Sequence, residues 1–386
     1  MARRTEDKYF VTCMKGFEKI LESELHALNI TKTEPDFSGV YFTGDQEDCY
    51  RANVWLRTGI RVLRELKRYT VNSNEDLYNG AKSIFWGDEF RLNQTFAVSA
   101  NVNDSVINHS GYAALKVKDA IADNFRDLYG SRPNVDTSDP DVRVVVRIQR
   151  EECVLSIDTS GEALHRRGYR VKMTKAPIKE NLAAGILLMA GYNGSQVLYD
   201  IMCGSGTFSI EAALIALNIA PGLSKESFGF QRLISFDKRL WAKVKREAES
   251  TKRNAVPKMI YASDISKKSV EVTKSNARKA GIRNLIDVSI KDFRNTHKRT
   301  DTGIIVVNPP YGIKLETGED EKLIKLYSDL GDTLKQRFTG HDAYIISTKD
   351  DYIKKLGLKA ASRMDVYNGP IECNLSKYEL YEGTEE

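Results

Sequence analysis

The sequence predicts an α/β protein whose second half forms an open, Rossmann-like parallel sheet covered by helices. Three observations in that half support this class. Apolar, strand-like runs alternate with helical segments, a glycine-rich turn follows the first run, and the run at 304–307 consists only of β-branched residues. Such a run suits a strand that is buried on both faces. Because open α/β sheets bind ligands beyond the carboxyl ends of their strands, we expect the functional residues there.

The composition predicts a soluble globular protein of two or three domains. Of its 386 residues, 41% are hydrophobic and 29% are charged, which allows a substantial core. No apolar run is long enough to span a membrane, and the first residues lack the apolar segment of a signal peptide. We therefore expect a cytoplasmic protein without membrane contact. The five scattered cysteines form no Cys-x-x-Cys pair, so neither a metal site nor a disulfide framework is expected.

The segment 1–68 reads as one α/β module. Helical periodicity covers 15–28, a strand between two glycines covers 39–44, and apolar residues at helical spacing predict a second helix over 48–68. A unit of this length and pattern suits a ferredoxin-like module. It contains no combination of residues that would support catalysis.

The pattern changes in the segment 69–160. We expect a short helix, a strand, a longer helix and two further strands, at 77–84, 95–100, 111–128, 142–148 and 153–159. This order and spacing resemble a THUMP domain, an RNA-binding module found in enzymes that modify tRNA and rRNA. The resemblance implies an RNA partner for the chain.

The remaining segment, 161–386, begins with a basic connector and carries the basic surplus of the chain. Residues 1–170 contain 24 basic and 26 acidic side chains, whereas the rest of the chain contains 34 and 27. The cluster from His165 to Lys175 interleaves Tyr169 with its cations, a pattern suited to phosphate binding. A solvated linker is the alternative interpretation of this cluster.

The glycine-rich turn has the features of a cofactor site. It reads Asp200-Ile-Met-Cys203-Gly204-Ser205-Gly206-Thr207 and runs from a strand into a helix. Its glycines let the backbone approach a ligand, and the helix start offers free N–H groups. Ser209 stands where a dinucleotide motif has its third glycine, and no phosphate clamp follows. Asp200 instead suits the cationic amine of S-adenosylmethionine, and Cys203 is expected to pack within the turn.

Acidic residues also follow the next two predicted strands. Asp264 ends the second strand, where a carboxylate is well placed to accept hydrogen bonds from two ribose hydroxyls. The third strand, at 286–290, runs into Asp292 and Phe293. This carboxylate can accept from adenine N6, and the aromatic ring can pack on the base. A surface loop acid is the alternative for Asp292.

The stretch Asn308-Pro-Pro-Tyr-Gly312 follows the β-branched strand and is the expected catalytic site. The two prolines end the strand by removing its hydrogen-bond donors, which leaves Asn308 at the carboxyl end. Asn308 Oδ1 and the Pro309 carbonyl can accept both hydrogens of an exocyclic amine on a nucleobase. Tyr311 can stack on a base that has rotated out of its helix. A proline-terminated loop without function is the alternative.

The other elements of the second half complete the expected sheet. Residues 218–257 form an insertion with a very basic helix at 238–253, and a terminal hairpin is expected over 359–381 around Asn368 and Gly369. The hairpin would bring the sheet to seven strands.

The motifs together resemble the THUMP-containing RNA guanine-N2 methyltransferases, especially the bacterial 23S rRNA family. The matching residues are the turn from Asp200 to Thr207, Asp264, Asp292 and the stretch from Asn308 to Gly312. The resemblance covers nearly the whole chain. It implies a class I methyltransferase fold, S-adenosylmethionine as cofactor with Asn308 beside it, and RNA as substrate, foremost rRNA and then tRNA.

Two alternatives remain beside this interpretation. Asn-Pro-Pro-Tyr also occurs in enzymes that methylate adenine N6 in nucleic acid, although the RNA-binding half argues against that substrate. A non-catalytic RNA-binding assembly factor is the other alternative, and the intact set of cofactor residues argues against it. No feature of the sequence indicates an oligomeric state.

Overall fold

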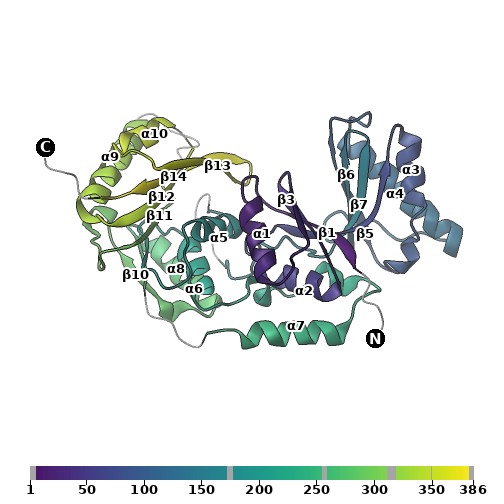
Figure 1. Cartoon of the computed structure of the whole chain (residues 1–386), viewed down its shortest axis with the longest axis horizontal. Coiled ribbons are helices and arrows are strands. Elements are labelled where there is room, and N and C mark those ends of the chain that lie inside the picture. The colour runs from purple at the N-terminus through teal and green to yellow at the C-terminus, as the bar shows by residue number, and fades with distance from the viewer. Residues whose placement is uncertain (1–5, 172–176, 254–258, 311–318, 349, 382–386) are drawn as a thin grey trace. The chain divides into compact units, whose positions relative to one another are not determined.

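The computed structural model describes residues 6–171, 177–253, 259–310, 319–348 and 350–381. The chain forms two compact units that are interleaved in sequence. The first unit consists of residues 1–13, 21–166 and 225–247, and the second consists of residues 14–20, 167–224 and 248–386. Within the described residues, each unit holds one seven-stranded sheet (Figure 1). None of the described helices is both long and apolar enough to span a membrane.

The sheet of the first unit has the strand order β2-β3-β1-β4-β7-β6-β5. Its strands are β1 (Asp7–Thr12), β2 (Thr33–Asp36), β3 (Gly39–Gly44), β4 (Arg61–Thr70), β5 (Phe96–Asn103), β6 (Val142–Gln149) and β7 (Glu152–Asp158). Among these seven strands, β5 and β6 pair in parallel and all other neighbours are antiparallel. The long strand β4 pairs with β1 on one side and β7 on the other, so it joins the two predicted modules in one sheet.

The helix predicted over 48–68 is wrong beyond its first half. Helix α2 (Gln46–Trp55) ends at Trp55, Leu56 has an extended backbone, and the chain then forms β4. Ladder pairing with β1 and β7 decides the conformation of β4, and the local spacing of apolar residues does not report such distant partners. Strand β2 was missed because it is short and contains Pro35. The proline is tolerated there because β2 lies at the edge of the sheet.

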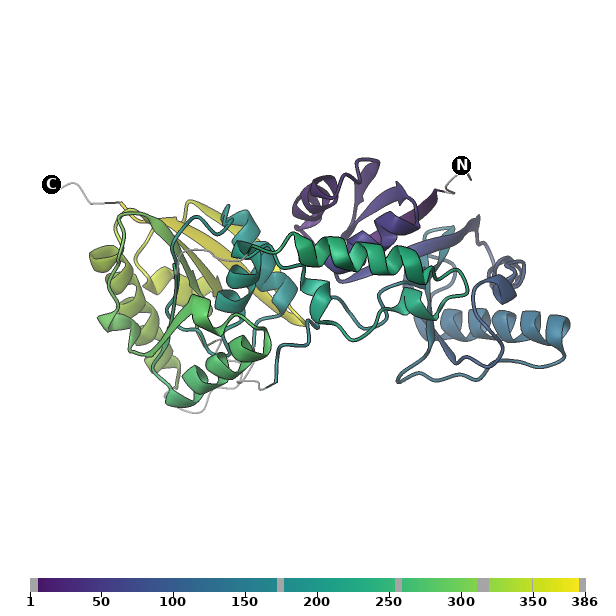
Figure 2. The same ribbon diagram turned by 90° about the horizontal axis from the view of Figure 1, so that it is seen from below.

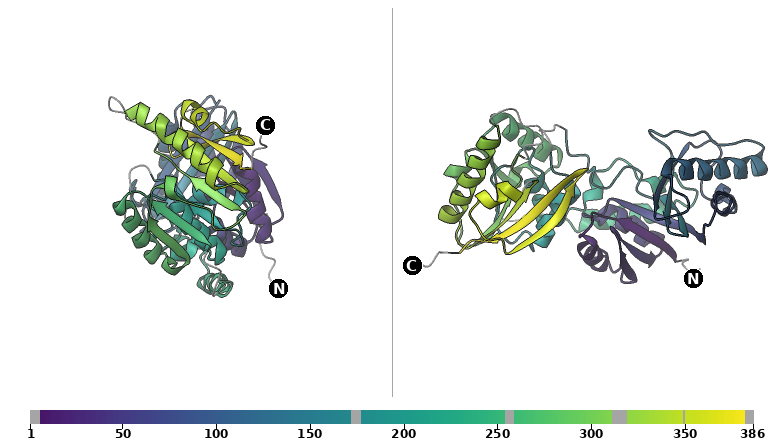
Figure 3. Two further views of the ribbon diagram at one scale, coloured as in Figure 1. Left: turned by 90° about the vertical axis from the view of Figure 1, so that its left-hand side faces the viewer. Right: turned by 90° about the horizontal axis from the view of Figure 1, so that it is seen from above.

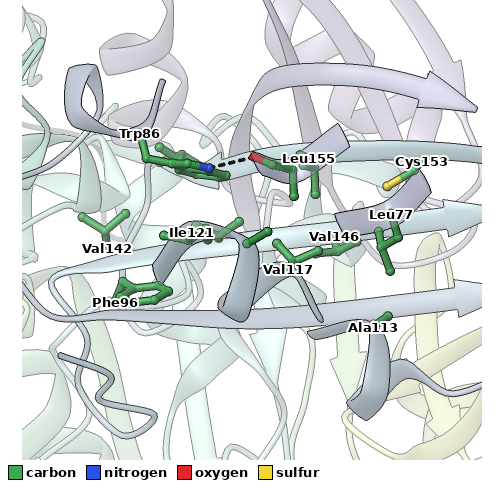
Figure 4. Packing of buried hydrophobic residues seen from close by; sticks show 14 of the residues in the cluster. Leu77, Trp86, Phe96, Ala113, Val117, Ile121, Val142, Val146, Cys153 and Leu155 are labelled. Atoms are coloured by element: carbon green, nitrogen blue, oxygen red, sulfur yellow. Dashed lines mark hydrogen bonds between the residues drawn. The ribbon is translucent and has the colours of Figure 1, made fainter. Parts of the chain in front are cut away.

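The second half of this sheet carries its own core. Helices α3 (Asn74–Lys82) and α4 (Ser110–Tyr129) pack on β5, β6 and β7 around the fully buried Trp86, Phe96 and Ile121 (Figure 4). The indole Nε1 of Trp86 donates to the Ala81 carbonyl at 2.9 Å, so the ring is buried without an unpaired polar atom. The remaining helix of the first module is α1 (Glu18–Ala27).

The inserted segment packs inside the first unit. Three of its aromatic rings contact Tyr50 of α2: Phe230 of the short helix η3 (Gly229–Arg232), Trp241 of helix α7 (Lys238–Ser250), and Phe236 between these helices. The Phe230 ring stacks on Tyr50 with centroids 4.2 Å apart, and Trp241 meets it edge-on at 6.1 Å. Leu233 joins the core under α3 and α4. Residues 225–247 of the predicted insertion are thus a structural part of the first unit, whereas its residues 218–224 and 248–253 belong to the second.

The second unit has the predicted seven-stranded sheet, with the order β10-β9-β8-β11-β12-β14-β13. Its strands are β8 (Leu198–Asp200), β9 (Ile260–Asp264), β10 (Ile286–Ile290), β11 (Gly303–Val307), β12 (His341–Ser347), β13 (Ser362–Asn368) and β14 (Ile371–Glu379). The first five strands of this order are parallel. The antiparallel β13–β14 hairpin completes the sheet (Figure 3).

Helices cover both faces of this sheet (Figure 2). Helices α9 (Glu319–Arg337) and α10 (Asp350–Lys355) pack on one face. Alternate residues of β11, Ile305 and Val307, point to this face and belong to its buried hydrophobic cluster. Helices α5 (Glu180–Met189), α6 (Thr207–Ala216) and α8 (Lys267–Lys279) lie on the other. Chain order reverses direction across the sheet between β8 and β11, and such a switch point is where open α/β sheets bind ligands.

Candidate active site

A cavity of about 470 Å³ lies at the switch point of the second unit. It opens at the carboxyl ends of β8, β9, β10 and β11, and its volume falls in the range of sites for small ligands and cofactors. Its wall contains most of the residues that the sequence predicted: Asp200, Cys203, Gly204, Ser205, Thr207, Asp264, Asp292, Phe293, Asn308 and Pro309. Gly206 is not in the wall, and Tyr311 and Gly312 lie outside the described residues.

Asp200 is the last residue of β8 and is buried at the base of the cavity. Its Oδ2 accepts from the Ser209 hydroxyl at 2.7 Å and from the Ser209 N–H at 3.3 Å. Burial raises the pKa of Asp200 to about 7, although these hydrogen bonds oppose the rise. A cation bound in the cavity would therefore be favourable, because it would stabilise the ionised form of Asp200, which burial destabilises.

Asp200→Asn should raise the thermal unfolding midpoint above that of the wild type, by more at about pH 8 than at about pH 5. In the unfolded chain an aspartate has a pKa of about 3.9. The folded wild type holds its proton more tightly, so it loses stability as pH rises from about 4 to about 7, whereas the amide does not ionise. Thermal unfolding of both proteins without cofactor, at several pH values, measures the difference. A gap that stays constant or narrows with rising pH contradicts this electrostatic description.

Two side chains of α8 hold the glycine-rich turn through packing and hydrogen bonds. Gly204 and Gly206 have φ values of 54° and 81°, and a Cβ on Gly206 would lie 2.6 Å from the methyl group of Thr273. The Thr273 hydroxyl donates to the Gly204 carbonyl at 3.0 Å, and Asn276 Nδ2 donates to the Ser205 carbonyl at 3.0 Å. Sequence reasoning missed both side chains. Their signal was two polar residues, three positions apart, on the buried face of the helix that follows Asp264.

Asp264 both supports this turn and faces the cavity. Its Oδ2 accepts from the Gly204 N–H at 3.0 Å, and its Oδ1 accepts from the Ser266 N–H at 2.8 Å. Ile265, next to it, is 69% exposed and lines the cavity. An apolar residue directly after the predicted ribose ligand was a signal for an apolar part of the cavity wall, and sequence reasoning did not use it.

Asp292 and Phe293 form the part of the wall that follows β10. Phe293 is buried and packs against the α9 cluster, so the position of its ring is fixed. The Asp292 carboxylate accepts from the Arg294 N–H at 2.9 Å and pairs with the Arg294 guanidinium at 2.7 Å. Because Arg294 also lines the cavity, the charge of Asp292 is partly neutralised at the site.

Two cations of the basic connector, Arg167 and Arg170, are paired inside the second unit. Arg167 is 1% exposed and pairs with the buried Glu211, whose Oε1 also accepts from the Tyr169 hydroxyl at 2.9 Å. Arg170 donates to Glu180 and to the Ile178 carbonyl, both at 2.9 Å, and to the Thr207 hydroxyl at 3.1 Å. Arg170 therefore links Ile178 and Thr207 of the cavity wall, whereas Arg167 is neutralised by Glu211 away from it. The phosphate-binding interpretation of the cluster does not hold for them, and Lys172 and Lys175 lie outside the described residues.

Asn308 and Pro309 follow β11 directly and form the side of the cavity across the switch point from Asp200. Val306 and Val307 before them are fully buried, which anchors this strand end. Among the described residues, no group of three or more His, Cys, Asp or Glu side chains is arranged to hold a metal ion.

The strand order, the turn after β8, the acid after β9 and the Asn-Pro-Pro segment after β11 define a class I methyltransferase, whose members use S-adenosylmethionine. Residues 167–377 match the RMKL-like methyltransferase domain, residues 71–158 match the THUMP domain and residues 8–63 match the RlmL ferredoxin-like domain. The chain belongs to the RMKL-like methyltransferase family.

Known relatives agree with this assignment. The chain is 38% identical to slr0064 of Synechocystis sp., named as an RNA methyltransferase, over 98% of each chain. It is 40% identical to the ribosomal RNA large subunit methyltransferase K/L of Cellvibrio japonicus over 97% of its own length. It spans about half the length of that relative, 51%.

Solved structures share the whole architecture. A protein described as a possible methylase of Clostridium difficile 630 superposes with a TM-score of 0.89 at 30% identity, covering 99% of this chain and all of that one. SMU.472, whose description names a methyltransferase complexed with S-adenosylhomocysteine, superposes with a TM-score of 0.85 at 27% identity, covering 99% of each chain.

Proposed function

We propose that the chain transfers a methyl group from S-adenosylmethionine to the exocyclic N2 amine of a guanosine in large-subunit ribosomal RNA. The observation that carries this proposal is the position of Asn308 and Pro309 in the cavity wall, across the switch point from Asp200. The names of the Synechocystis and Cellvibrio relatives support RNA and rRNA as substrates. The THUMP match supports an RNA partner, and tRNA is the second candidate substrate.

The cavity fits S-adenosylmethionine. The raised pKa of Asp200 favours the cationic amine of the cofactor, because that charge would allow the carboxylate to ionise. Asp264 would accept from the ribose hydroxyls, with Ile265 and Phe293 as apolar walls for the adenine and Asp292 as acceptor for its N6 amine. The backbone from Cys203 to Thr207 would pass along the cofactor. When bound, the cofactor supplies an electrophilic methyl group.

Asn308 and Pro309 act on the nucleophile. The amine of guanine is a weak nucleophile, because its lone pair is delocalised into the ring. Two oxygen acceptors, Asn308 Oδ1 and the Pro309 carbonyl, would hold its hydrogens and favour the pyramidal, reactive form. Tyr311 would stack on the flipped base. The chain thus contributes orientation and polarisation, which act mainly in the transition state.

Asp264→Ala should weaken cofactor binding by about 1.5–3 kcal/mol, because it removes charge-assisted hydrogen bonds. Part of the loss will come from the Gly204 N–H, which loses its acceptor. Calorimetric titration with S-adenosylmethionine measures the effect. Asp287→Ala, which removes a carboxylate from β10 outside the cavity, is the matched control. Equal affinities in the two variants would remove Asp264 from the cofactor site.

Methylation of isolated substrates tests the proposed substrate class. The full chain is incubated with methyl-labelled S-adenosylmethionine and either large-subunit rRNA, tRNA or duplex DNA. We expect label in the rRNA. Label confined to tRNA would redirect the proposal, and label in DNA would favour the adenine-N6 alternative, which matches the description of a Listeria monocytogenes relative with 30% identity as an N6-adenine-specific DNA methylase.

A further inference from the structure

Helix α7 has one face that is bound to the first unit. Val244 is buried, Trp241 packs in the aromatic cluster, and the cations of this face are neutralised. Lys243 Nζ contacts Glu47 at 2.9 Å, and Arg51 of α2 bridges to Glu247 at 2.9 Å. These contacts attach residues 238–247 of α7 to the first unit.

The opposite face of α7 carries four cations, Lys238, Arg239, Lys245 and Arg246, and all four are exposed. In the described part of the chain, none of their side chains forms an ion pair or a hydrogen bond. Glu249 is the exposed acid near them. Arg61 and Arg64 of the same unit, by contrast, pair with Asp158 and with Glu89.

The spacing of these charges is regular. Lys238 and Lys245 are seven residues apart, as are Arg239 and Arg246, so the two pairs lie on one side of the helix about 10 Å apart along its axis. No side chain of α7 is among the large exposed hydrophobic residues of the described chain. A protein partner would require an apolar anchor in its contact surface, whereas a polyanion requires only spaced cations.

We propose that the outer face of α7 binds phosphate groups of the RNA substrate. This inference rests on the proposed function, because it takes that RNA as the occupant. The inserted segment would then add a second RNA contact to the unit that carries the THUMP domain. Arginine suits this task because its planar guanidinium can bind a phosphate through two donors. The aromatic packing of Trp241 holds the helix that carries these side chains in place before RNA binds.

Two double variants of the full chain test the proposal: K238Q/R239Q and K245Q/R246Q. The probe is a protein-free transcript of large-subunit rRNA, and its Kd is measured from about 50 to 200 mM salt. Each lost phosphate contact should reduce the slope of log K against log salt by about 0.7–0.9, so each double variant should lose up to twice that. Affinity should fall most at low salt. Affinity for S-adenosylmethionine and the thermal midpoint should stay at wild-type values.

The matched control is R278Q/K279Q, which removes two exposed cations from the last turn of α8. We expect its slope to equal that of the wild type. If the α7 variants keep the wild-type slope, or if the control loses as much slope as they do, the assignment of α7 is overturned while the proposed function stands. If the wild type itself neither binds nor methylates the transcript, the proposed function and this inference fail together.

Discussion

Asn308→Ala should lower the single-turnover rate of RNA methylation by about 10²–10³ at saturating cofactor, the usual cost of losing one polar group that acts on the reacting atoms. Affinity for S-adenosylmethionine should change much less. The reason is that the side chain would hold the amine hydrogens in the reactive geometry, and such contacts act on the rate more than on binding. Rapid-quench measurement with excess enzyme separates this step from RNA binding and product release.

Two further substitutions sharpen this test. Asn308→Asp keeps an acceptor and should retain more activity than Asn308→Ala. Asn295→Ala removes an exposed asparagine that does not line the cavity, so it should leave the rate unchanged. A wild-type rate for Asn308→Ala would show that the reacting group is held elsewhere and that this strand end is a proline-terminated loop.

Phe230→Ala should lower the free energy of unfolding of the first unit by about 3–5 kcal/mol, the usual cost of removing a buried aromatic ring. Phe230 is 2% exposed, and its ring meets Tyr50 at 4.2 Å, Phe228 at 5.2 Å and Trp241 at 5.2 Å. The substitution would open a cavity where the inserted segment packs on α2. Denaturant unfolding, followed by hydrogen exchange on the amides of α2 and α7, measures the loss.

Phe37→Ala is the matched control, because Phe37 belongs to the same unit and is 69% exposed. Its effect should stay within about 0.5 kcal/mol. If the two substitutions cost the same, the aromatic cluster does not hold the inserted segment.

A chain cut to residues 161–386 would not keep all of these packing contacts. It would expose the aromatic cluster around Phe230, and it would lack Phe17, whose ring packs against Gly185 in the second unit.

The second unit was predictable because its signals are local. The β-branched run of β11, the glycines at 204 and 206 and the turn at Asn368 and Gly369 each determine a conformation through a few neighbouring residues. Right-handed crossover connections between parallel strands leave few alternatives for their order. The acids at their carboxyl ends therefore had to meet at one edge, where the cavity lies.

The first unit was harder to predict because its decisive contacts are distant in sequence. β4 is a strand because it pairs with β1 and with β7, which begins more than 80 residues away. The inserted segment 225–247 belongs to this unit because Phe230 meets Tyr50, and no local pattern reports that partner. In the site, the support of the glycine-rich turn by Thr273 and Asn276 was missed for the same reason.

The central claim is methylation of guanine N2, and nucleoside analysis of the product tests it most directly. Large-subunit rRNA from cells that lack this protein is methylated by the purified chain, digested to nucleosides and analysed by mass spectrometry. We predict that the transferred methyl group appears in N2-methylguanosine at one position. A methyl group recovered in N6-methyladenosine, or no transfer to this rRNA, would contradict the claim.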